Sequence, residues 1–486
     1  MHPAHDSLLR ETRRQFLGRT GTGLGLAALG HLLGSQRADA AGTPTASIAS
    51  PRPHHPARAK HAIYLFQNGA PTHVDLFDHK PELRKRHGKP LPDSYIGGKR
   101  FSTMTGKADG KLMLAPVEPF RQHGQSGAWV SDFLPHTGRI ADELCFIKGM
   151  HTDAVNHAPA ISLMLSGAQI PGRPTLGAWL TYGLGSESEN LPAFAVMTSV
   201  SKGTTCGQIF YDFYWGSGFL PSRYQGVKFR GGTEPVLYLA NPAGLPESAR
   251  RSMLDDVGAL NRLKLEAHGD PEIATRIAQY EMAFRMQTSV PELTDIAGES
   301  EGSLALYGDD VKKPGSFANS VLMARRMVER GVRFVQIYLN HWDTHANVVG
   351  RLKSGCKDID QPCHGLIQDL KARGLLDETL VIWGGEFGRT VYSQGGLSKE
   401  NYGRDHHPRC FTMWMAGGGA RGGQIYGETD DFSYNIVKDP VHIRDFHATV
   451  LQLLGFDHER FTYRHLGLDQ KLTGVEHARV IQDLIA

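Results

Sequence analysis

The feature that most constrains the fold is an alternation of short apolar runs with helix-like segments, which begins near residue 62. Runs of this kind are typical of strands that are buried on both faces. The runs are residues 62–66, 144–147, 193–197, 332–339, 380–383 and 411–416, and the clearest helical patterns are 316–330, 365–373, 443–454 and 476–485. Helix alternating with strand predicts an α/β fold: a doubly wound, mostly parallel sheet with helices on both faces.

One stretch breaks this alternation. Residues 246–291 indicate two polar helices, which Gly269-Asp270-Pro271 separates. In the first helix, Leu254, Val257, Leu260 and Leu263 recur at helical spacing, and we interpret this stripe as a packing surface rather than a binding surface. The segment from about 200 to 310 is therefore predicted to be a helical insertion that packs on the sheet.

The first forty residues have the organisation of an export signal. Arg13 and Arg14 precede a weakly apolar run at 21–33, and an Ala-Asp-Ala site follows at 38–40. An amphipathic helix that begins at Arg13 is the alternative reading. We expect a twin-arginine signal peptide over 1–40, which makes the twin-arginine export machinery a partner and the location periplasmic or secreted.

Residues 41–60 are rich in Pro, His, Ala and Arg, and they predict a flexible linker. Residues 61–486 would then form one α/β domain. The full chain has a net charge of +3, and the leader carries five Arg against three acidic residues, so its removal leaves +1. A nearly neutral protein gives no reason to expect nucleic acid as a partner. No second apolar stretch is long enough for a transmembrane segment.

The five cysteines do not form the pattern of a disulfide scaffold, and the chain contains no CxxC. Cys356 and Cys363 are close enough in sequence to close a small disulfide loop, which export would permit. Reduced, partly buried thiols are the alternative.

Residues with metal-binding chemistry follow the predicted strands. His341, Asp343 and His345 come directly after the run 332–339. If the extended backbone continues, their side chains project to one side. Imidazole and carboxylate ligands at that spacing suit Zn²⁺, Mn²⁺ or Fe.

Three further clusters lie beside other predicted strands. These contain His73 and Asp75 near the first strand, Glu386 and Arg389 in a glycine turn after 380–383, and Asp405, His406 and His407 before 411–416. Ligands of open α/β sheets bind at the carboxyl ends of the parallel strands, so we expect one convergent site. An ordinary turn with a surface salt bridge is the alternative for Glu386 and Arg389.

A fifth segment, residues 150–159, leads from the run 144–147 into an apolar helix that begins near His157. A helix N-terminus suits a phosphate or sulfate group. Thr152 is a candidate nucleophile there, and Asn156 and His157 could bind substrate or metal. The alternative is that Asp153 or Asn156 simply caps the helix.

Together these segments resemble the family known as "domain of unknown function 1501", a branch of the alkaline-phosphatase superfamily whose members are often labelled sulfatases. The matching segments are NGAPTHVDLFD (68–78), HTDAVNH (151–157), ARRMVERGVRFVQIYLNHWDTH (324–345), LVIWGGEFGRT (380–390), GRDHHP (403–408) and GGGARGGQIYGETD (417–430). The resemblance implies an alkaline-phosphatase-like fold and one or two metal ions around a phosphate or sulfate ester.

By position, Asp343 and His345 resemble the superfamily's Asp-then-His ligand pair, and His406 or His407 resembles its late His. Glu386 falls where the superfamily has an Asp-His pair, but Phe387 follows it. Strand one ends in Gln67-Asn68, where the superfamily has a metal-binding Asp. No Cys-x-Pro-x-Arg or Ser-x-Pro-x-Arg occurs, so the chain is not expected to be a formylglycine sulfatase.

The sequence thus predicts an exported, metal-dependent hydrolase of phosphate or sulfate esters. Its cofactors would be divalent metal ions (Zn, Mn, Ca or Mg), and its substrates small-molecule or polysaccharide esters. The alternative is a non-catalytic protein that binds a metal or ligand on the same fold.

Overall fold

The computed structural model describes residues 51–97, 111–201, 210–232, 234–237, 239–242, 244–394, 397–398 and 402–486. The predicted leader, 1–40, lies outside these residues. Within the segment expected to be a linker, residues 51–60 form no helix or strand. Backbone N–H groups of His54, Arg58 and Ala59 nevertheless donate to the carbonyls of Leu453 and Gly455, so this stretch is hydrogen-bonded to the domain.

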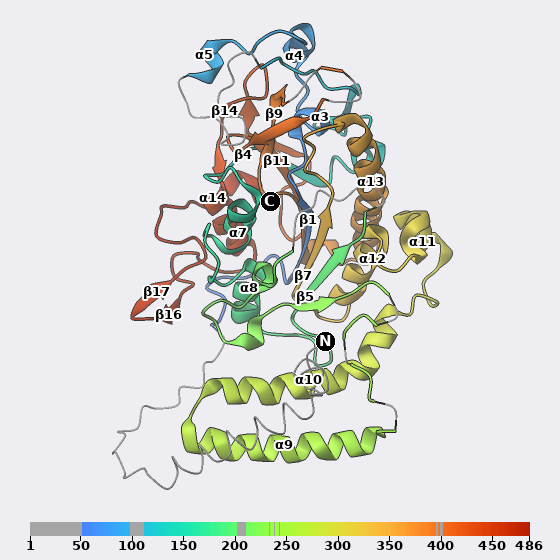
Figure 1. Cartoon of the computed structure of the whole chain (residues 1–486), viewed down its shortest axis with the longest axis vertical. Coiled ribbons are helices and arrows are strands. Elements are labelled where there is room, and N and C mark those ends of the chain that lie inside the picture. Colours follow the sequence, from blue (N-terminus) through green and yellow to red (C-terminus); the bar gives the residue numbers. More distant parts are fainter. Residues whose placement is uncertain are drawn as a thin grey trace, which may run out of the picture. The chain divides into compact units, whose positions relative to one another are not determined.

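A nine-stranded sheet forms the centre of the domain, in the order β12-β4-β11-β8-β1-β7-β5-β6, with β15 paired to β4 (Figure 1). The strands are β1 His61–Asn68, β4 Leu144–His151, β5 Phe194–Ser199, β6 Val227–Phe229, β7 Phe334–Asn340, β8 Thr379–Gly384, β11 Phe411–Ala416, β12 Gln424–Tyr426 and β15 Val441–His442. All pairings are parallel except those of β11, which runs antiparallel to β4 and β8. The predicted mostly parallel sheet is confirmed.

Side chains of the central strands alternate between two buried faces, as expected for a doubly wound sheet. In β1, Ile63 and Leu65 belong to the large hydrophobic core that the helices α12 (Phe317–Val328) and α13 (Val348–Ala372) cover. The ring of Phe66 meets Tyr338 of β7 on the other face, edge to face at 5.4 Å. Every residue of β1 is buried, which explains its continuous apolar run.

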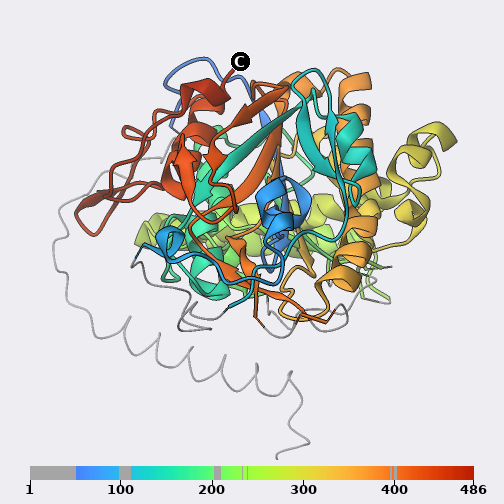
Figure 2. The ribbon, with the colours of Figure 1, turned by 90° about the horizontal axis from the view of Figure 1, so that it is seen from above.

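Helices cover both faces of the sheet. The helices α7 His157–Ser166, α8 Leu176–Leu184 and α14 Ile443–Leu453 lie on one side, and α12 Phe317–Val328 and α13 Val348–Ala372 on the other (Figure 1). The long orange α13 also stands at one side of the strands in the view from above (Figure 2). Shorter helices are α3 His73–Leu76, α4 Pro81–Lys85, α5 Asp93–Ile96, α6 Pro135–Arg139 and α11 Glu301–Tyr307.

Two helix predictions were wrong in extent. Residues 476–485 contain only the 3-10 turn Gln482–Leu484, so the predicted terminal helix does not form. The helix expected at 365–373 is the last part of α13, which begins at Val348. Gly355 and Pro362 in the earlier part argued against a helix, but that part is held by packing: Leu352, Cys356 and Ile359 are buried in the core.

The predicted insertion contains both expected polar helices, α9 Glu247–His268 and α10 Pro271–Thr294. The packing role that we expected for the stripe on α9 was wrong for three of its four residues, because Val257, Leu260 and Leu263 are exposed, whereas Leu254 is half-buried. No helix among the described residues is long and apolar enough to cross a membrane.

Cys356 and Cys363 lie on α13 as free, buried thiols, which decides against the disulfide loop. Burial raises the pKa of both thiols well above the usual value, so neither is a ready nucleophile at neutral pH.

The edge of the sheet at which the parallel strands end positions the candidate site. Asn68 at the end of β1 is in register with Asn340 at the end of β7, and Phe66 is in register with Gly384 of β8. Beyond this edge lies a two-stranded sheet of β9 Gly388–Ser393 and β10 Arg404–His407. Three smaller pairs complete the strands: β2 Phe120–His123 with β3 Ala128–Ser131, β13 Glu428–Thr429 with β14 Ile436–Lys438, and β16 Tyr463–His465 with β17 Leu468–Gln470.

Candidate metal centre

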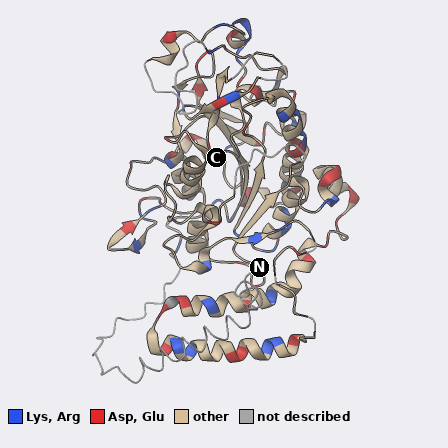
Figure 3. Cartoon of the chain, in the orientation of Figure 1, with Lys and Arg blue, Asp and Glu red and all other residues tan. Residues whose placement is uncertain are grey.

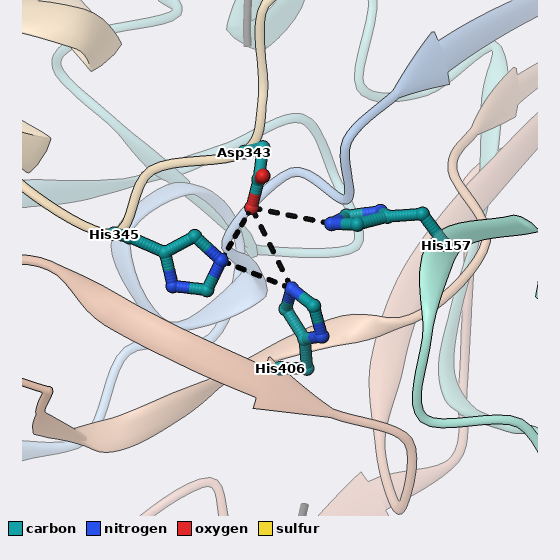
Figure 4. A group of neighbouring side chains, drawn as sticks. All are labelled: His157, Asp343, His345 and His406. Carbon is teal, nitrogen blue, oxygen red and sulfur yellow. Dashed lines mark hydrogen bonds and ion pairs between the residues drawn. The ribbon is translucent and has the colours of Figure 1, made fainter. Parts of the chain in front are cut away.

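Four side chains from three parts of the chain point toward one another beside the carboxyl end of the sheet (Figure 4). His157 is the first residue of α7, Asp343 and His345 follow β7, and His406 lies on β10. Each offers one ligand atom, and these atoms all lie within 4.8 Å of one another. We call these four residues the His/Asp cluster.

Distances within the cluster fit a single ion. Asp343 Oδ1 lies 3.2 Å from His157 Nε2, 2.8 Å from His345 Nε2 and 3.6 Å from His406 Nε2. The Nε2 atoms of His345 and His406 are 3.1 Å apart. In a tetrahedral zinc site with bonds of ~2.0–2.1 Å, ligand atoms lie about 3.3–3.4 Å from one another. The four separations, from 2.8 to 3.6 Å, are therefore close to those of such a site, and all ligand atoms lie within 4.8 Å of one another.

The ring nitrogens that face away from the cluster fix the orientation of all three imidazoles. His157 Nδ1 donates to Glu386 Oε1 at 2.5 Å, His406 Nδ1 donates to the carbonyl of Val155 at 2.8 Å, and His345 Nδ1 donates to Gln394 Oε1. A proton on each Nδ1 leaves a lone pair on each Nε2, and every lone pair is directed into the cluster. His157 Nε2 is buried and lies 3.2 Å from Asp343 Oδ1.

When all three imidazoles are neutral, three lone pairs and a carboxylate oxygen therefore converge on one point. Such an arrangement is repulsive by itself and becomes favourable when a cation occupies the centre. Imidazole nitrogens with one carboxylate suit Zn²⁺, Mn²⁺ or Fe better than Ca²⁺ or Mg²⁺, which prefer oxygen ligands. The donor set fits a divalent transition metal.

Glu386 and Arg389 were expected at this site, and the structure places both beside the cluster. The fully buried Glu386 accepts hydrogen bonds from the backbone N–H of Gly69 and from His157, so it supports a ligand rather than facing the centre. Arg389 Nη2 donates to Asp343 Oδ1 at 2.6 Å, and its other donors bind the carbonyls of Gly69, Ala70 and Arg404.

Arg389 is completely buried. Its guanidinium is therefore engaged by the protein and does not face a substrate.

The electrostatics follow from these contacts. Burial alone would raise the pKa of the Asp343 carboxyl, but the imidazoles of His157, His345 and His406 and the charge of Arg389 hold it far below its usual range. Burial lowers the pKa of His406 to about 4. Burial also opposes the charged form of His157, but its contacts with Asp343 and Glu386 raise its pKa above the usual value. Asp343 is thus ionised and His406 neutral at neutral pH, the forms that bind a metal.

Five residues predicted as ligands have their side chains elsewhere. β7 ends at Asn340, and the backbone N–H groups of His341 and Trp342 both turn to the carbonyl of Asn68, so the extended spacing assumed for 341–345 is lost. His341 Nε2 instead meets the carbonyl of Arg351 at 2.7 Å, under α13. The single-site expectation is therefore wrong for His341.

The remaining four are held by structural contacts. Asp75 forms a buried ion pair with Arg404 at 2.6 Å, and His73 Nε2 lies 3.3 Å from the carbonyl of Ser433. His407 stacks on Tyr434 and bonds its carbonyl, whereas Asp405 accepts from the backbone N–H of His406. His407 points away from its neighbour because alternate residues of β10 face opposite sides.

Near α7, the structure separates the three residues that the sequence grouped. His157 joins the cluster, whereas Asn156 is exposed and makes no side-chain capping bond. The hydroxyl of the buried Thr152 accepts a long hydrogen bond from the N–H of Ala154, at 3.5 Å. Asp153 pairs with Arg444 and His442, so the capping alternative fails for Asp153 as well as for Asn156.

Gln394 and the backbone of Gly69 were not predicted to take part. Gln394 lies 49 residues from His345, the histidine that it orients, and no local pattern marks it. Gly69 had a signal in the sequence Asn68-Gly69-Ala70-Pro71, which is typical of a turn. Its N–H and C=O hold Glu386 and Arg389 together.

Comparison with known families agrees with the sequence motifs. The family described as "Protein of unknown function (DUF1501)" matches residues 59–485, and the chain belongs to this family. No curated protein matches the chain in sequence.

Several solved structures are similar to this chain, with low sequence identities and low TM-scores. A sulfatase from Pseudoalteromonas sp. is 13% identical with a TM-score of 0.35, and the match covers 86% of this chain and 72% of that one. The alkaline phosphatase of the Antarctic bacterium TAB5 is 12% identical with a TM-score of 0.31, over 82% and 98% of the two chains. A phosphonate monoester hydrolase from Silicibacter pomeroyi is 10% identical with a TM-score of 0.30, over 68% and 71%.

Proposed function

We propose that this member of the DUF1501 family is a metal-dependent hydrolase of phosphate or sulfate esters, with one divalent ion held by His157, Asp343, His345 and His406. The observation that carries the proposal is the orientation of the three imidazoles. Each has its far nitrogen bonded to an acceptor and its near nitrogen directed at Asp343 Oδ1. Side chains that only fill a core have no need of that shared orientation.

When bound, a divalent ion would polarise the ester and lower the pKa of a water nucleophile. We assign the nucleophile to water, because water can bind to such an ion directly. The side chains of His157 and His406 are 7% and 3% exposed, against 26% for His345. The substrate would therefore approach past His345.

Asp343 and the three residues that support the cluster from outside have different roles. Asp343 contributes the negative charge that attracts a cation. Arg389 partly neutralises this charge, because its guanidinium forms an ion pair with the same Oδ1. Glu386 holds the ring of His157, and Gln394 holds that of His345. Preorganised donors of this kind cost no rearrangement when the substrate binds.

Two matched variants test the proposal. We expect His345→Gln to lose both bound metal and hydrolysis of aryl phosphates and aryl sulfates in the presence of Zn²⁺ or Mn²⁺. His341→Gln, four residues away, keeps a donor for the Arg351 carbonyl and should retain both. Elemental analysis of each purified protein gives the ion count. Equal metal content and activity in the two variants would contradict the proposed site.

One observation favours the non-catalytic alternative. Two cavities of about 340 and 250 Å³ are lined by other parts of the fold, among them Gly308 and Ser316 in one and Phe229 and Pro235 in the other, and neither of these two includes a cluster residue. A binding protein would hold the metal and turn over no ester of any class. Metal bound at one ion per chain without hydrolysis would favour that function.

We also propose export through the twin-arginine route, on the strength of Arg13, Arg14 and the Ala-Asp-Ala site at 38–40. Exchange of both arginines for lysine should leave an unprocessed precursor inside the cell. Normal processing of that variant would contradict this route.

A further inference from the structure

The long helix α9 presents an apolar stripe to solvent. Met253, Val257, Leu260 and Leu263 are 57%, 39%, 61% and 63% exposed. Their spacing of three and four residues puts them on one side of the helix. Of the 22 residues of α9, only Gly258 is buried. In the described part of the chain this stripe has no partner.

The stripe is distinct from the side of α9 that packs on α10. Arg251 faces α10, where it pairs with Glu281 at 2.6 Å and lies over the ring of Phe284. Leu254 and Gly258 follow Arg251 at helical spacing. Each residue advances about 100° around the helix axis, so the side that carries Leu254 and Gly258 lies roughly 140° from Leu260. A helix that folds only to pack on α10 needs no second apolar side.

The charges of α9 narrow the choice of partner. The helix carries four basic residues (Arg250, Arg251, Arg262, Lys264) and four acidic residues (Glu247, Asp255, Asp256, Glu266). Figure 3 shows both signs along α9 and α10. Helices that lie on membranes are rich in Lys and Arg on the polar side, and nucleic-acid surfaces are strongly basic. A neutral mixture of both signs matches a surface that also carries both, such as a second copy of α9.

We propose that α9 forms an antiparallel pair with α9 of a second copy, centred on Leu260. A two-fold axis beside Leu260 brings Val257 level with Leu263 of the second copy. The same symmetry brings Asp256 level with Lys264 of the second copy, twice in the pair. A parallel pair would instead set Asp256 beside Asp256. Opposite charges therefore favour the antiparallel register and like charges disfavour the parallel one.

The size of this contact predicts a weak dimer. With 22 residues, α9 is about 33 Å long and about 10 Å wide, so its face covers on the order of 330 Å². Stable interfaces bury about 800 Å² per partner. We expect a pair that dissociates on dilution rather than a permanent dimer, and the pairing is independent of the metal centre.

Sedimentation velocity of the full chain over a wide range of concentrations tests the pairing. Leu260→Lys should raise the dissociation constant by about tenfold or more, because two like charges would meet at the axis. Asp256→Lys and Lys264→Asp should each weaken the dimer, and the double variant should restore it. A parallel pair would give no such rescue. Glu266→Lys, an exposed charge change away from the stripe, serves as the control.

A chain that stays monomeric at every concentration would overturn the proposal, as would a double variant no stronger than the single ones. Binding of the monomer to phospholipid vesicles, lost in Leu260→Lys, would overturn it in favour of a membrane surface. Leu260 is exposed, so thermal melts of the variants should match the wild type and exclude misfolding as the cause.

Discussion

At the scale of single residues, the contrast between His341 and His345 shows what determines whether a histidine becomes a ligand of the metal site. Both stand beside Asp343 in the sequence, and both were predicted to bind metal. The chain turns at the end of β7, so His345 Nε2 meets Asp343 at 2.8 Å whereas His341 meets a carbonyl of α13. Every second residue points to the same side only as long as the chain remains a β-strand. The types of ligand could be predicted from the sequence, but the selection among them depended on backbone bonds to Asn68.

Glu386 gives a prediction at this scale. Glu386→Gln keeps an oxygen acceptor for His157 Nδ1 but removes the negative charge that strengthens that bond. Loss of such a supporting group lowers metal affinity by about 10–100-fold. Competition titration with a metal indicator measures the affinity. Glu378→Gln removes an exposed carboxylate from the same region of sequence and should leave it unchanged.

At the scale of elements, the cluster depends on how strand ends meet. The close approach of β1 to the loop after β7 requires glycine at position 69, where φ is +102° and a Cβ atom would lie 2.5 Å from the backbone N of Asp343. The strand before Asp343 and His345 and the helix that begins at His157 were predicted near their true places, whereas β10, which supplies His406, was not predicted as a strand. No sequence pattern indicated that β9 and β10 pair with each other away from the main sheet.

Gly69→Ala should therefore disturb both stability and metal binding. The strained backbone costs about 1–3 kcal/mol, and the clash displaces Asp343. Gly88→Ala is the matched control, because its φ is +77° but its nearest neighbour is a side-chain atom of Leu397 at 3.6 Å. Denaturant unfolding and metal titration of both variants measure the effects. Equal loss of metal affinity in the two would mean that the contact at Gly69 is unimportant.

The contact between α14 and α7 predicts a pH dependence. His447 is fully buried and bonds the carbonyl of Met164 at 2.7 Å, and burial lowers its pKa to about 4. The unfolded chain takes up a proton on this residue near pH 6.5, whereas the folded chain does so only near pH 4. The free energy of unfolding should thus fall between pH 6.5 and 4, by up to ~1.4 kcal/mol per pH unit from this residue.

His447→Gln keeps a donor for Met164 and cannot titrate, so its stability should fall less steeply with acid. His407, with a pKa of about 3, remains in the variant, which leaves part of the slope. Urea unfolding at several pH values gives both curves. Identical slopes would show that His447 is already protonated in the folded protein.

At the scale of the whole molecule, the alternation of strands and helices was enough to predict the sheet, because buried parallel strands leave a continuous apolar signal. The signal failed where packing overrides local preference, as in α13 with Pro362 inside it. It failed also on α9, where an apolar stripe marks an exposed surface instead of a buried one. In both cases the outcome depends on what packs against the helix, either the rest of the fold or a second molecule, and a local sequence pattern does not contain that information.

The central claim is that one divalent ion binds between His157, Asp343, His345 and His406. Crystals grown with Zn²⁺ or Mn²⁺ and measured at the absorption edge of the metal test it most directly. We predict one strong anomalous peak, about 2.0–2.2 Å from His157 Nε2, Asp343 Oδ1, His345 Nε2 and His406 Nε2. A peak bound instead by His341 or His73, or no peak at the cluster with metal in excess, would contradict the account.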